Sequence, residues 1–306
     1  MRLLTRSDFD GLACAAVLKD RGLIDANSIK FVHPKDIQDG LVEVTDNDIL
    51  ANIPYVKGCK LWFDHHSSEN VRLGDDVKFE GAARLEDSAA HVVYDYYGGE
   101  KTMPYFVEMI KAVDKVDAAK LTADEILNPK GWVLLGFVMD PRTGLGRFRN
   151  FRISNYELME MLIDACRNMT IDEILVLPDV KERMDLYFEQ DALFRDMVKK
   201  HTRTDGNVII SDLRGLETIY TGNRFVVYSL YPKQNISMWI VDGRAKLNCP
   251  IAVGHSILNR TSKTDVGALL LKYGGGGHHQ VGTCQVPYGD ADKVIGELVA
   301  QMKKDG

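Results

Sequence analysis

Short apolar runs alternate with helix-like stretches along the first third of the chain. The strand-like runs are 2–5, 29–33, 48–53 and 60–63. Helix-like stretches rich in Ala, Leu and Val follow at 11–22 and 87–97, and Gly22 is expected to end the first of them. Strands that alternate with helices predict a parallel sheet of the α/β class.

A different pattern begins after the first third. Residues 155–200 are highly charged, with apolar residues three and four positions apart, which predicts helices. Ser154 is expected to cap the first of these helices, and Pro178 to open the second. We interpret this region as a helical connector between two domains.

Strand signals return after residue 206. We expect strands at 207–213, 224–232, 236–242 and 250–258, and helices at 264–273 and 290–304. This pattern predicts a second, smaller α/β domain. The expected bounds are 1–140 for the first domain, 141–204 for the connector and 205–306 for the second domain.

Composition restricts the class of protein. The chain has 306 residues, 45% of them hydrophobic, which is enough for two domains with separate cores. Its net charge of −6 argues against charge-driven binding of long nucleic acid. The longest apolar run, 132–139, is too short to span a bilayer, and Asp8 and Asp10 interrupt any signal sequence. We therefore expect a cytoplasmic protein without a membrane partner.

The cysteines follow no metal or disulfide pattern. They are Cys14, Cys59, Cys166, Cys249 and Cys284. None forms a C-x-x-C pair, and their number is odd. We expect free thiols that are mostly buried.

Two acids follow the first predicted strand. Asp8 and Asp10 are two positions apart, and Gly11 begins the next predicted helix. Open α/β sheets bind ligands at the carboxyl ends of their strands, so both carboxylates are expected at one locus there. Crowded carboxylates repel unless a cation joins them, and oxygen ligands of this kind suit Mg²⁺ or Mn²⁺. The same pattern also occurs in simple turns, where Asp caps a helix.

A second polar group ends another strand-like run. Asp64, His65 and His66 follow the apolar residues 61–63. Carboxylate and imidazole ligands together fit Mn²⁺ or Fe²⁺ better than Ca²⁺. One histidine is then expected to face a metal, while the other supports the site or contacts substrate. The alternative is a helix cap followed by two surface histidines.

A glycine run marks the second domain. Gly275, Gly276 and Gly277 precede His278, between a predicted helix and the strand-like stretch 281–286. Such a loop allows close approach of a ligand to backbone N–H groups, and His278 is expected to bond a phosphate oxygen. The alternative is a flexible turn.

The three motifs, in this order, resemble those of the DHH phosphoesterases over nearly the whole chain. The matching residues are Asp8-Phe9-Asp10-Gly11, Asp64-His65-His66 and Gly275-Gly276-Gly277-His278. The resemblance implies an N-terminal parallel-sheet DHH domain with a Mn²⁺ pair and a C-terminal DHH-associated domain that holds substrate. It also implies an active-site cleft between the two lobes. Members include exopolyphosphatase-like proteins, RecJ-type exonucleases, nano-RNases and cyclic-dinucleotide phosphodiesterases.

The resemblance also implies roles for individual residues. The implied metal ligands are Asp8, Asp10, Asp64, His65 and one of Asp114 and Asp117, with Asn52 where the family usually has an aspartate. Asp64, His65 and His66 are the implied catalytic residues. The family commonly has a histidine just before the two aspartates, whereas this chain has Thr5-Arg6-Ser7. A site with two metals, a site with one metal and a degenerate site all remain open.

Basic residues extend the expected substrate site. The candidates are His255, Arg260, Gly275, Gly276, Gly277, His278 and Arg142. Arg142 belongs to a stretch, 140–152, in which arginines alternate with phenylalanines, a composition that suits phosphates and stacked bases. The alternative for this stretch is a solvated connector.

These observations predict a metal-dependent phosphoesterase that acts on small substrates. Short oligonucleotides, short single-stranded nucleic acid, cyclic or linear dinucleotides, and polyphosphate are the substrates that the resemblance implies. Mn²⁺ is the expected metal, with Mg²⁺ and Co²⁺ as alternatives, and a homodimer is left open. The alternative function is a degenerate relative that binds a nucleotide or phosphate for regulation. A further alternative is an unrelated α/β protein whose motifs are coincidental.

Overall fold

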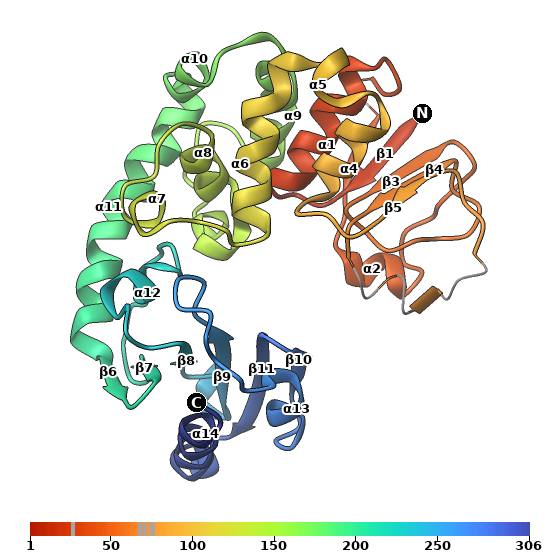
Figure 1. Ribbon diagram of the computed structural model, residues 1–306. Coiled ribbons are helices and arrows are strands. Elements are labelled where there is room, and N and C mark those ends of the chain that lie inside the picture. Colours follow the sequence, from red (N-terminus) through yellow and green to blue (C-terminus); the bar gives the residue numbers. More distant parts are fainter. Residues whose placement is uncertain (26–27, 67–68, 70–71, 74–76) are drawn as a thin grey trace. The chain divides into compact units, whose positions relative to one another are not determined.

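A computed structural model describes residues 1–25, 28–66, 69, 72–73 and 77–306. The chain divides into two compact units. The N-terminal unit contains residues 1–120 and 129–186, and the C-terminal unit contains residues 121–128 and 187–306. Each unit has its own sheet, and each is described separately below (Figure 1).

A parallel sheet forms the centre of the N-terminal unit. Its strands are β1 (Arg2–Thr5), β2 (Ile29–Phe31), β3 (Asp48–Ala51), β4 (Leu61–Asp64) and β5 (Gly81–Ala83). Their order in the sheet is β2-β1-β3-β4-β5, and every neighbouring pair is parallel. This confirms the predicted parallel sheet of the α/β class. All carboxyl ends of the strands consequently point to one edge.

Helices cover both faces of this sheet. Those of the N-terminal unit are α1 (Phe9–Asp20), α2 (Pro34–Gln38), α4 (Ala89–Tyr96), α5 (Gly99–Thr102), α6 (Val107–Asp117), α8 (Gly131–Met139), α9 (Asn155–Asn168) and α10 (Ile171–Leu175). Helices α1, α4 and α6 pack against one another on one side of the sheet (Figure 1). On the other face, Trp62 packs in one cluster with Ile37 of α2. Neighbouring side chains of β4 point to opposite faces, so Phe63 contacts Tyr96 of α4 instead.

A long helix, α11 (Pro178–His201), runs from the N-terminal unit into the C-terminal unit. It begins at Pro178, as predicted. Ser154 caps α9, and its hydroxyl accepts the Glu157 amide while the Glu157 carboxylate accepts the Ser154 amide. None of the helices that the described residues form combines the length and hydropathy needed to cross a membrane.

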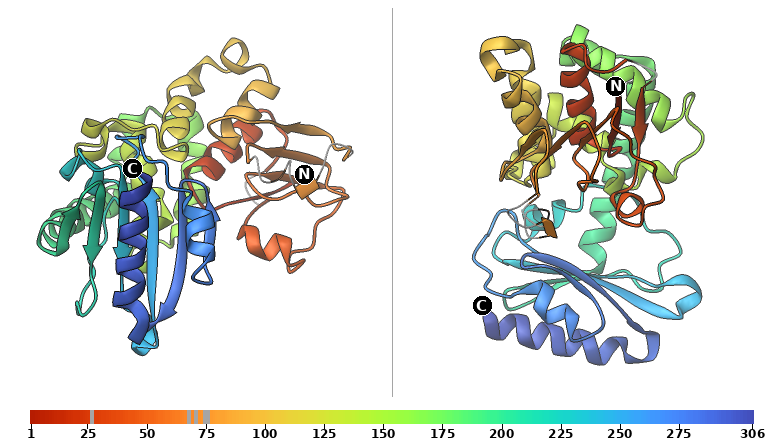
Figure 2. Two further views of the ribbon diagram at one scale, coloured as in Figure 1. Left: turned by 60° about the horizontal axis from the view of Figure 1, so that its bottom comes forward. Right: turned by 90° about the vertical axis from the view of Figure 1, so that its right-hand side faces the viewer.

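The C-terminal unit has a mixed sheet. Its strands are β6 (Thr202–Asp205), β7 (Val208–Asp212), β8 (Ile236–Ile240), β9 (Asn248–His255), β10 (Gly276–His278) and β11 (Val281–Pro287). Their order is β10-β11-β9-β8-β7-β6, in which only the β7–β8 pair is parallel. The unit also contains the helices α7 (Ala123–Leu127), α12 (Val226–Leu230), α13 (Val266–Leu271) and α14 (Ala291–Asp305). Helices α13 and α14 share one apolar core with the sheet, and Figure 2 shows α14 along its face.

One predicted strand is wrong. The stretch 224–232 contains α12, a short helix, although its aromatic and β-branched residues favour a strand. Asn223 accepts the Phe225 amide just before this helix. The Tyr228 hydroxyl lies 2.8 Å from the Ser237 hydroxyl in a buried hydrogen bond. This contact joins residues of two different elements, so local strand propensity cannot predict it. The five cysteines are free thiols, as expected.

Candidate metal and catalytic site

Asp8 and Asp10 lie where β1 passes into α1. Asp8 is the N-cap of α1, and its Oδ1 atom accepts the Gly11 amide at 2.9 Å. Asp10 lies in the first turn of the helix and is 2% exposed. A Cβ atom at Gly11 would lie 2.0 Å from the Arg6 carbonyl oxygen, so this close turn requires glycine. The turn brings both carboxylates to the carboxyl edge of the parallel sheet.

The Asp10 carboxylate is held by the start of a second helix. Its two oxygens accept the backbone amides of Ala89 and Ala90 at 3.0 and 2.7 Å. These amides belong to the first turn of α4, where N–H groups have no partner inside the helix. The helix terminus therefore orients Asp10 and favours its negative charge.

Asp64 ends β4, and the two histidines follow it directly. Nδ1 of His66 lies 2.8 Å from Oδ1 of Asp64. Nδ1 of His65 lies 3.1 Å from the Glu86 carbonyl oxygen, which can only accept, so Nδ1 carries the hydrogen. In the neutral ring, Nε2 of His65 is then the atom with the lone pair. It lies 3.4 Å from Oδ2 of Asp117 and 3.8 Å from Oδ2 of Asp10.

The two aspartates of α6 have different surroundings in the structure. Asp117 is the last residue of the helix and faces His65 and Asp10. Asp114 lies one turn earlier and accepts hydrogen bonds from Ser88 at 2.6 Å and His91 at 2.7 Å. Asp114 therefore supports the start of α4, while Asp117 lines the site.

Asn52 follows β3 and also reaches this edge of the sheet. Its backbone is left-handed, with φ of 59°, a conformation that asparagine adopts more readily than most residues. Its side-chain amide donates to Oδ1 of Asp8 at 3.2 Å. Asp48, at the opposite end of β3, instead pairs with Arg2 at 2.7 Å.

The electrostatics of the site favour a bound cation. Burial raises the pKa of Asp10 well above its ordinary value, and the charges of Asp117 and Asp8 raise it further. Burial lowers the pKa of His66, but the hydrogen bond to Asp64 outweighs this effect, so the net pKa of His66 is raised. A cation bound beside Asp10 would therefore offset both the burial of its charge and the repulsion from the neighbouring carboxylates.

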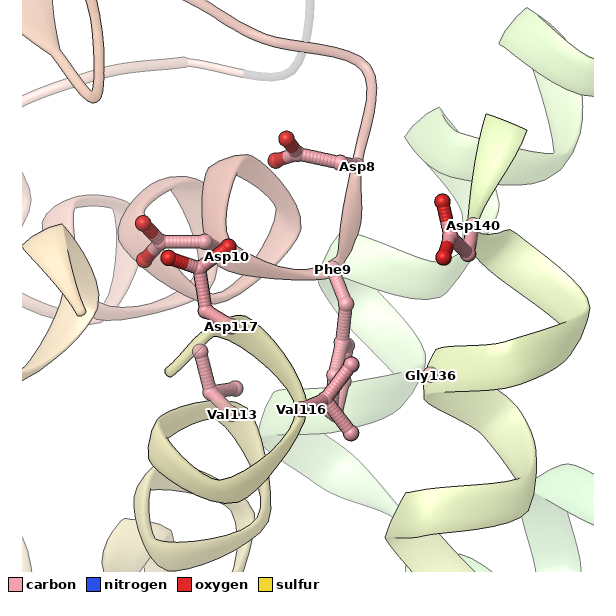
Figure 3. Close-up of a pocket in the computed structure, with 8 residues that line it drawn as sticks. All are labelled: Asp8, Phe9, Asp10, Val113, Val116, Asp117, Gly136 and Asp140. Carbon is pink, nitrogen blue, oxygen red and sulfur yellow. The ribbon is translucent and has the colours of Figure 1, made fainter. Parts of the chain in front are cut away.

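Unpartnered atoms support the same conclusion. Among the described residues, Oδ2 of Asp64, Nε2 of His65 and Oδ1 of Asn52 are buried without a hydrogen-bond partner. Asp10 and Asp117 border a small cavity of about 10 Å³, together with Asp8 (Figure 3). Buried lone pairs of this kind are costly unless an ion or water uses them. Carboxylate oxygens with one imidazole nitrogen are the donors that Mn²⁺ accepts, so these residues fit such an ion.

Two further residues reach the site that sequence reasoning did not assign to it. Arg6 forms an ion pair with Asp8, its Nε lying 3.0 Å from Oδ2. Asp140, just after α8, borders the same cavity as Asp10 (Figure 3). Asp140 follows the apolar run 132–139, just as Asp64 follows the apolar run 61–63. This position after an apolar run was the one signal in the sequence that could have assigned Asp140 to the site.

The glycine run of the C-terminal unit forms a close-packed hairpin, β10 and β11. A Cβ atom at Gly275 would lie 2.2 Å from the Thr283 carbonyl oxygen, and one at Gly277 would lie 2.2 Å from that of Val281. His278 is exposed on this hairpin. The glycines therefore allow strand contact, and their expected role in binding anions stays a prediction.

The other expected substrate residues occupy the same unit, except Arg142. The His255 amide donates to the Gln280 carbonyl oxygen at 2.9 Å, beside the hairpin turn. Nε2 of His255 lies 2.8 Å from the Thr264 carbonyl oxygen. Arg260 is exposed, and its Nε donates to the Ile257 carbonyl oxygen. The side chain of Arg142 lies outside the described residues.

Comparison with solved structures assigns the family. A pGpG-specific phosphodiesterase, PggH from Vibrio cholerae, is 51% identical, with a TM-score of 0.90 over 100% of this chain and 99% of that protein. This chain belongs to the DHH phosphoesterase family. It is therefore a hydrolase of phosphoric esters. Neither a scan against protein-family models nor a search of curated proteins gave a match for this DHH phosphoesterase.

More distant structures share the fold of this DHH phosphoesterase. The DHH domain of a member of a family of ribosomal proteins is 12% identical with a TM-score of 0.60, covering 99% of this chain and 87% of that one. RecJ of Thermus thermophilus, solved in complex with Mn²⁺, is 13% identical with a TM-score of 0.54, covering 99% of this chain and 52% of that one. At such identities the likeness concerns the fold alone.

Proposed function

We propose that this protein is a metal-dependent phosphodiesterase that hydrolyses linear dinucleotides such as pGpG. The observation that carries the proposal is the 51% identity, over both units, to a pGpG-specific phosphodiesterase. Hydrolysis of the single internucleotide bond of pGpG adds one water and yields two molecules of GMP. The acidic balance of the chain is consistent with a short substrate, because long strands need many uncompensated basic groups.

Four residues form the proposed metal site. They are Asp10, Asp64, His65 and Asp117. A divalent cation bound there would lower the pKa of a coordinated water and offset negative charge on the phosphoryl group. Other groups of the chain orient two of these donors. The backbone amides at the start of α4 bind the Asp10 carboxylate, and the Glu86 carbonyl oxygen accepts a hydrogen bond from the ring of His65.

His66 is the proposed general acid. Its bond to Asp64 favours the protonated ring, and its side chain is 40% exposed, so it is open to substrate. A proton on His66 can pass to the ribose oxygen that leaves when the phosphorus–oxygen bond breaks. Asp64 then has two proposed functions. One of its oxygens orients His66. The other, which has no hydrogen-bond partner among the described residues, binds the metal.

The C-terminal unit is proposed to hold the substrate. His278 on the β10–β11 hairpin, together with His255 and Arg260, provides imidazole and guanidinium groups for phosphate oxygens. Arg142 is proposed as a further phosphate contact. Variants with alanine at these positions are expected to raise KM for the dinucleotide more than they lower kcat.

Product analysis tests the proposed function. The purified protein with Mn²⁺ would be offered pGpG, a cyclic dinucleotide, a longer single strand and polyphosphate, and the products would be separated by chromatography. We expect GMP from pGpG, with much slower turnover of the other three. Asp64→Asn should lower turnover at least about 100-fold, whereas the control Asp185→Asn, whose ion pair with Lys181 lies on the surface, should not. Equal turnover of polyphosphate, or turnover that persists after chelation, would contradict the proposal.

A further inference from the structure

Both carboxylate oxygens of Asp8 are engaged by groups of the chain itself. Oδ1 accepts the Gly11 amide at 2.9 Å and the Asn52 side-chain amide at 3.2 Å. Oδ2 lies 3.0 Å from Nε of Arg6. The Asp8 side chain is 9% exposed, so the ion pair is largely shielded from water on the carboxylate side. Asp8 therefore has a positive partner before any metal binds.

The other part of the cluster is organised differently. Ligand atoms of Asp10, His65 and Asp117 all lie within 4.8 Å of one another. Nε2 of His65 and Oδ2 of Asp64 are buried and have no hydrogen-bond partner in the described part of the chain. The direct partners of Asp10 include two backbone amides, which are neutral. A cation bound here would have the unpartnered atoms of Asp64 and His65 as donors.

The state of Asp8 distinguishes a site for one cation from a site for two. A second cation beside Asp8 would compete with the Gly11 amide, the Asn52 amide and the Arg6 guanidinium for its two oxygens. Arg6 carries a permanent positive charge, because a guanidinium does not lose its proton in proteins. Asn52 adds no charge for a second ion, since its amide is neutral.

We infer that this protein binds a single divalent cation, at Asp10, Asp64, His65 and Asp117, and that Arg6 supplies the second positive charge of the site at Asp8. The inference rests on the proposed metal-dependent function. A guanidinium in this position cannot activate a water, but it can pair with an anionic phosphoryl oxygen.

The geometry of Arg6 is suited to that role. Its contact with Asp8 uses Nε, and neither terminal nitrogen has a hydrogen bond to another described residue. The side chain is 31% exposed, so part of it is accessible to a ligand. Asp8 then acts as a positioning residue, because it holds the guanidinium beside the metal ligands.

Metal stoichiometry tests the inference without any measurement of turnover. Mn²⁺ would be titrated into the purified protein, and free Mn²⁺ would be measured from its electron paramagnetic resonance signal. We expect one bound ion per chain. The double variant Arg6→His with Asn52→Asp removes the guanidinium and adds an imidazole and a carboxylate next to Asp8. It is expected to bind two ions.

The possible results separate this inference from the proposed function. Two ions in the parent protein would overturn the inference and leave metal-dependent hydrolysis intact. A double variant that folds, by circular dichroism, yet still binds one ion would also overturn it, because Arg6 would not be what excludes the second ion. Absence of any bound ion in the parent protein would contradict the metal-dependent function itself.

A second experiment tests the contact between Arg6 and phosphate. Arg6→Gln is expected to weaken binding of GMP, measured by calorimetry, by about 10-fold. The matched control is Arg167→Gln, because Nε of Arg167 also lies 3.0 Å from an aspartate, Asp20, whose side chain is also 9% exposed. The control should bind GMP as the parent does. Unchanged binding by Arg6→Gln, or an equal loss in both variants, would remove Arg6 from the substrate site.

Discussion

Nε2 of His65 lies 3.4 Å from Oδ2 of Asp117, although one residue follows β4 and the other ends α6. Nδ1 of the same ring points to the Glu86 carbonyl oxygen, so the nitrogen with the lone pair faces the carboxylate. Nε2 of His65 is buried and has no hydrogen-bond partner among the described residues, so a metal ion bound between these two atoms could use both as donors. We therefore expect substitution of His65 or Asp117 to disturb the proposed metal site more than substitution of the residues around it.

Asp117 and Asp114 are expected to respond differently to the same substitution. Asp117→Asn should lower kcat for the dinucleotide at least about 100-fold, because it removes a charged donor of the proposed metal site. Asp114→Asn should lower kcat no more than about 10-fold, because an amide oxygen can still accept from Ser88. Steady-state kinetics of the two variants provide the comparison. Equal losses would show that Asp117 has no special role.

His66 is expected to matter most when the leaving group is poor. His66→Gln should lower kcat for a dinucleotide by about 100-fold, because the ribose oxygen needs a proton as it leaves. A p-nitrophenyl phosphodiester leaves as a stable anion, so its hydrolysis should fall much less. The ratio of the two losses is the measurement. If both substrates slowed equally, His66 would be a structural partner of Asp64 and not an acid.

Gly11 is expected to contribute to the stability of the fold, because a side chain does not fit at this position. Gly11→Ala would place Cβ 2.0 Å from the Arg6 carbonyl oxygen, and relief of this clash should cost about 1–3 kcal/mol of unfolding free energy. Gly296→Ala in α14 is the control, because no atom lies within 4 Å of the added Cβ. This control should gain up to about 1 kcal/mol from helix propensity. Urea denaturation measures both, and equal stability of the two variants would contradict the prediction.

The Arg2–Asp48 pair is expected to make stability depend on acid pH. Burial raises the pKa of Asp48, but hydrogen bonds from Arg2 and Thr45 outweigh this effect, so the net pKa is lowered. A carboxyl with a lowered folded pKa stabilises the fold above its unfolded pKa of about 4, and this stabilisation is lost as pH falls toward the folded pKa. Asp48→Asn should therefore be less stable than the parent near pH 7, with the difference shrinking below about pH 4. Denaturation across this range tests the sign, and a difference independent of pH would refute it.

Much of the site follows from the order of residues along the chain. Asp8, Asn52 and Asp64 each come just after or at the end of a strand-like run, and parallel strands bring such positions to one edge. The strand–helix alternation that predicts this sheet is a local pattern. Local patterns failed at 224–232, where contacts of Tyr228 with a distant strand outweigh strand propensity.

Folding in three dimensions was needed to distinguish Asp117 from Asp114 and to place Arg6. The two aspartates lie three positions apart on one helix, so they share a face, and periodicity cannot say which meets His65. That choice depends on how α6 packs beside α4, whose Ser88 and His91 engage Asp114. Arg6 appears in the sequence as a basic residue in a loop, and only the backbone path of that loop turns its side chain onto Asp8. The strand ends thus bring the right chemistry to one edge of the sheet, and long-range packing sets the direction of each side chain.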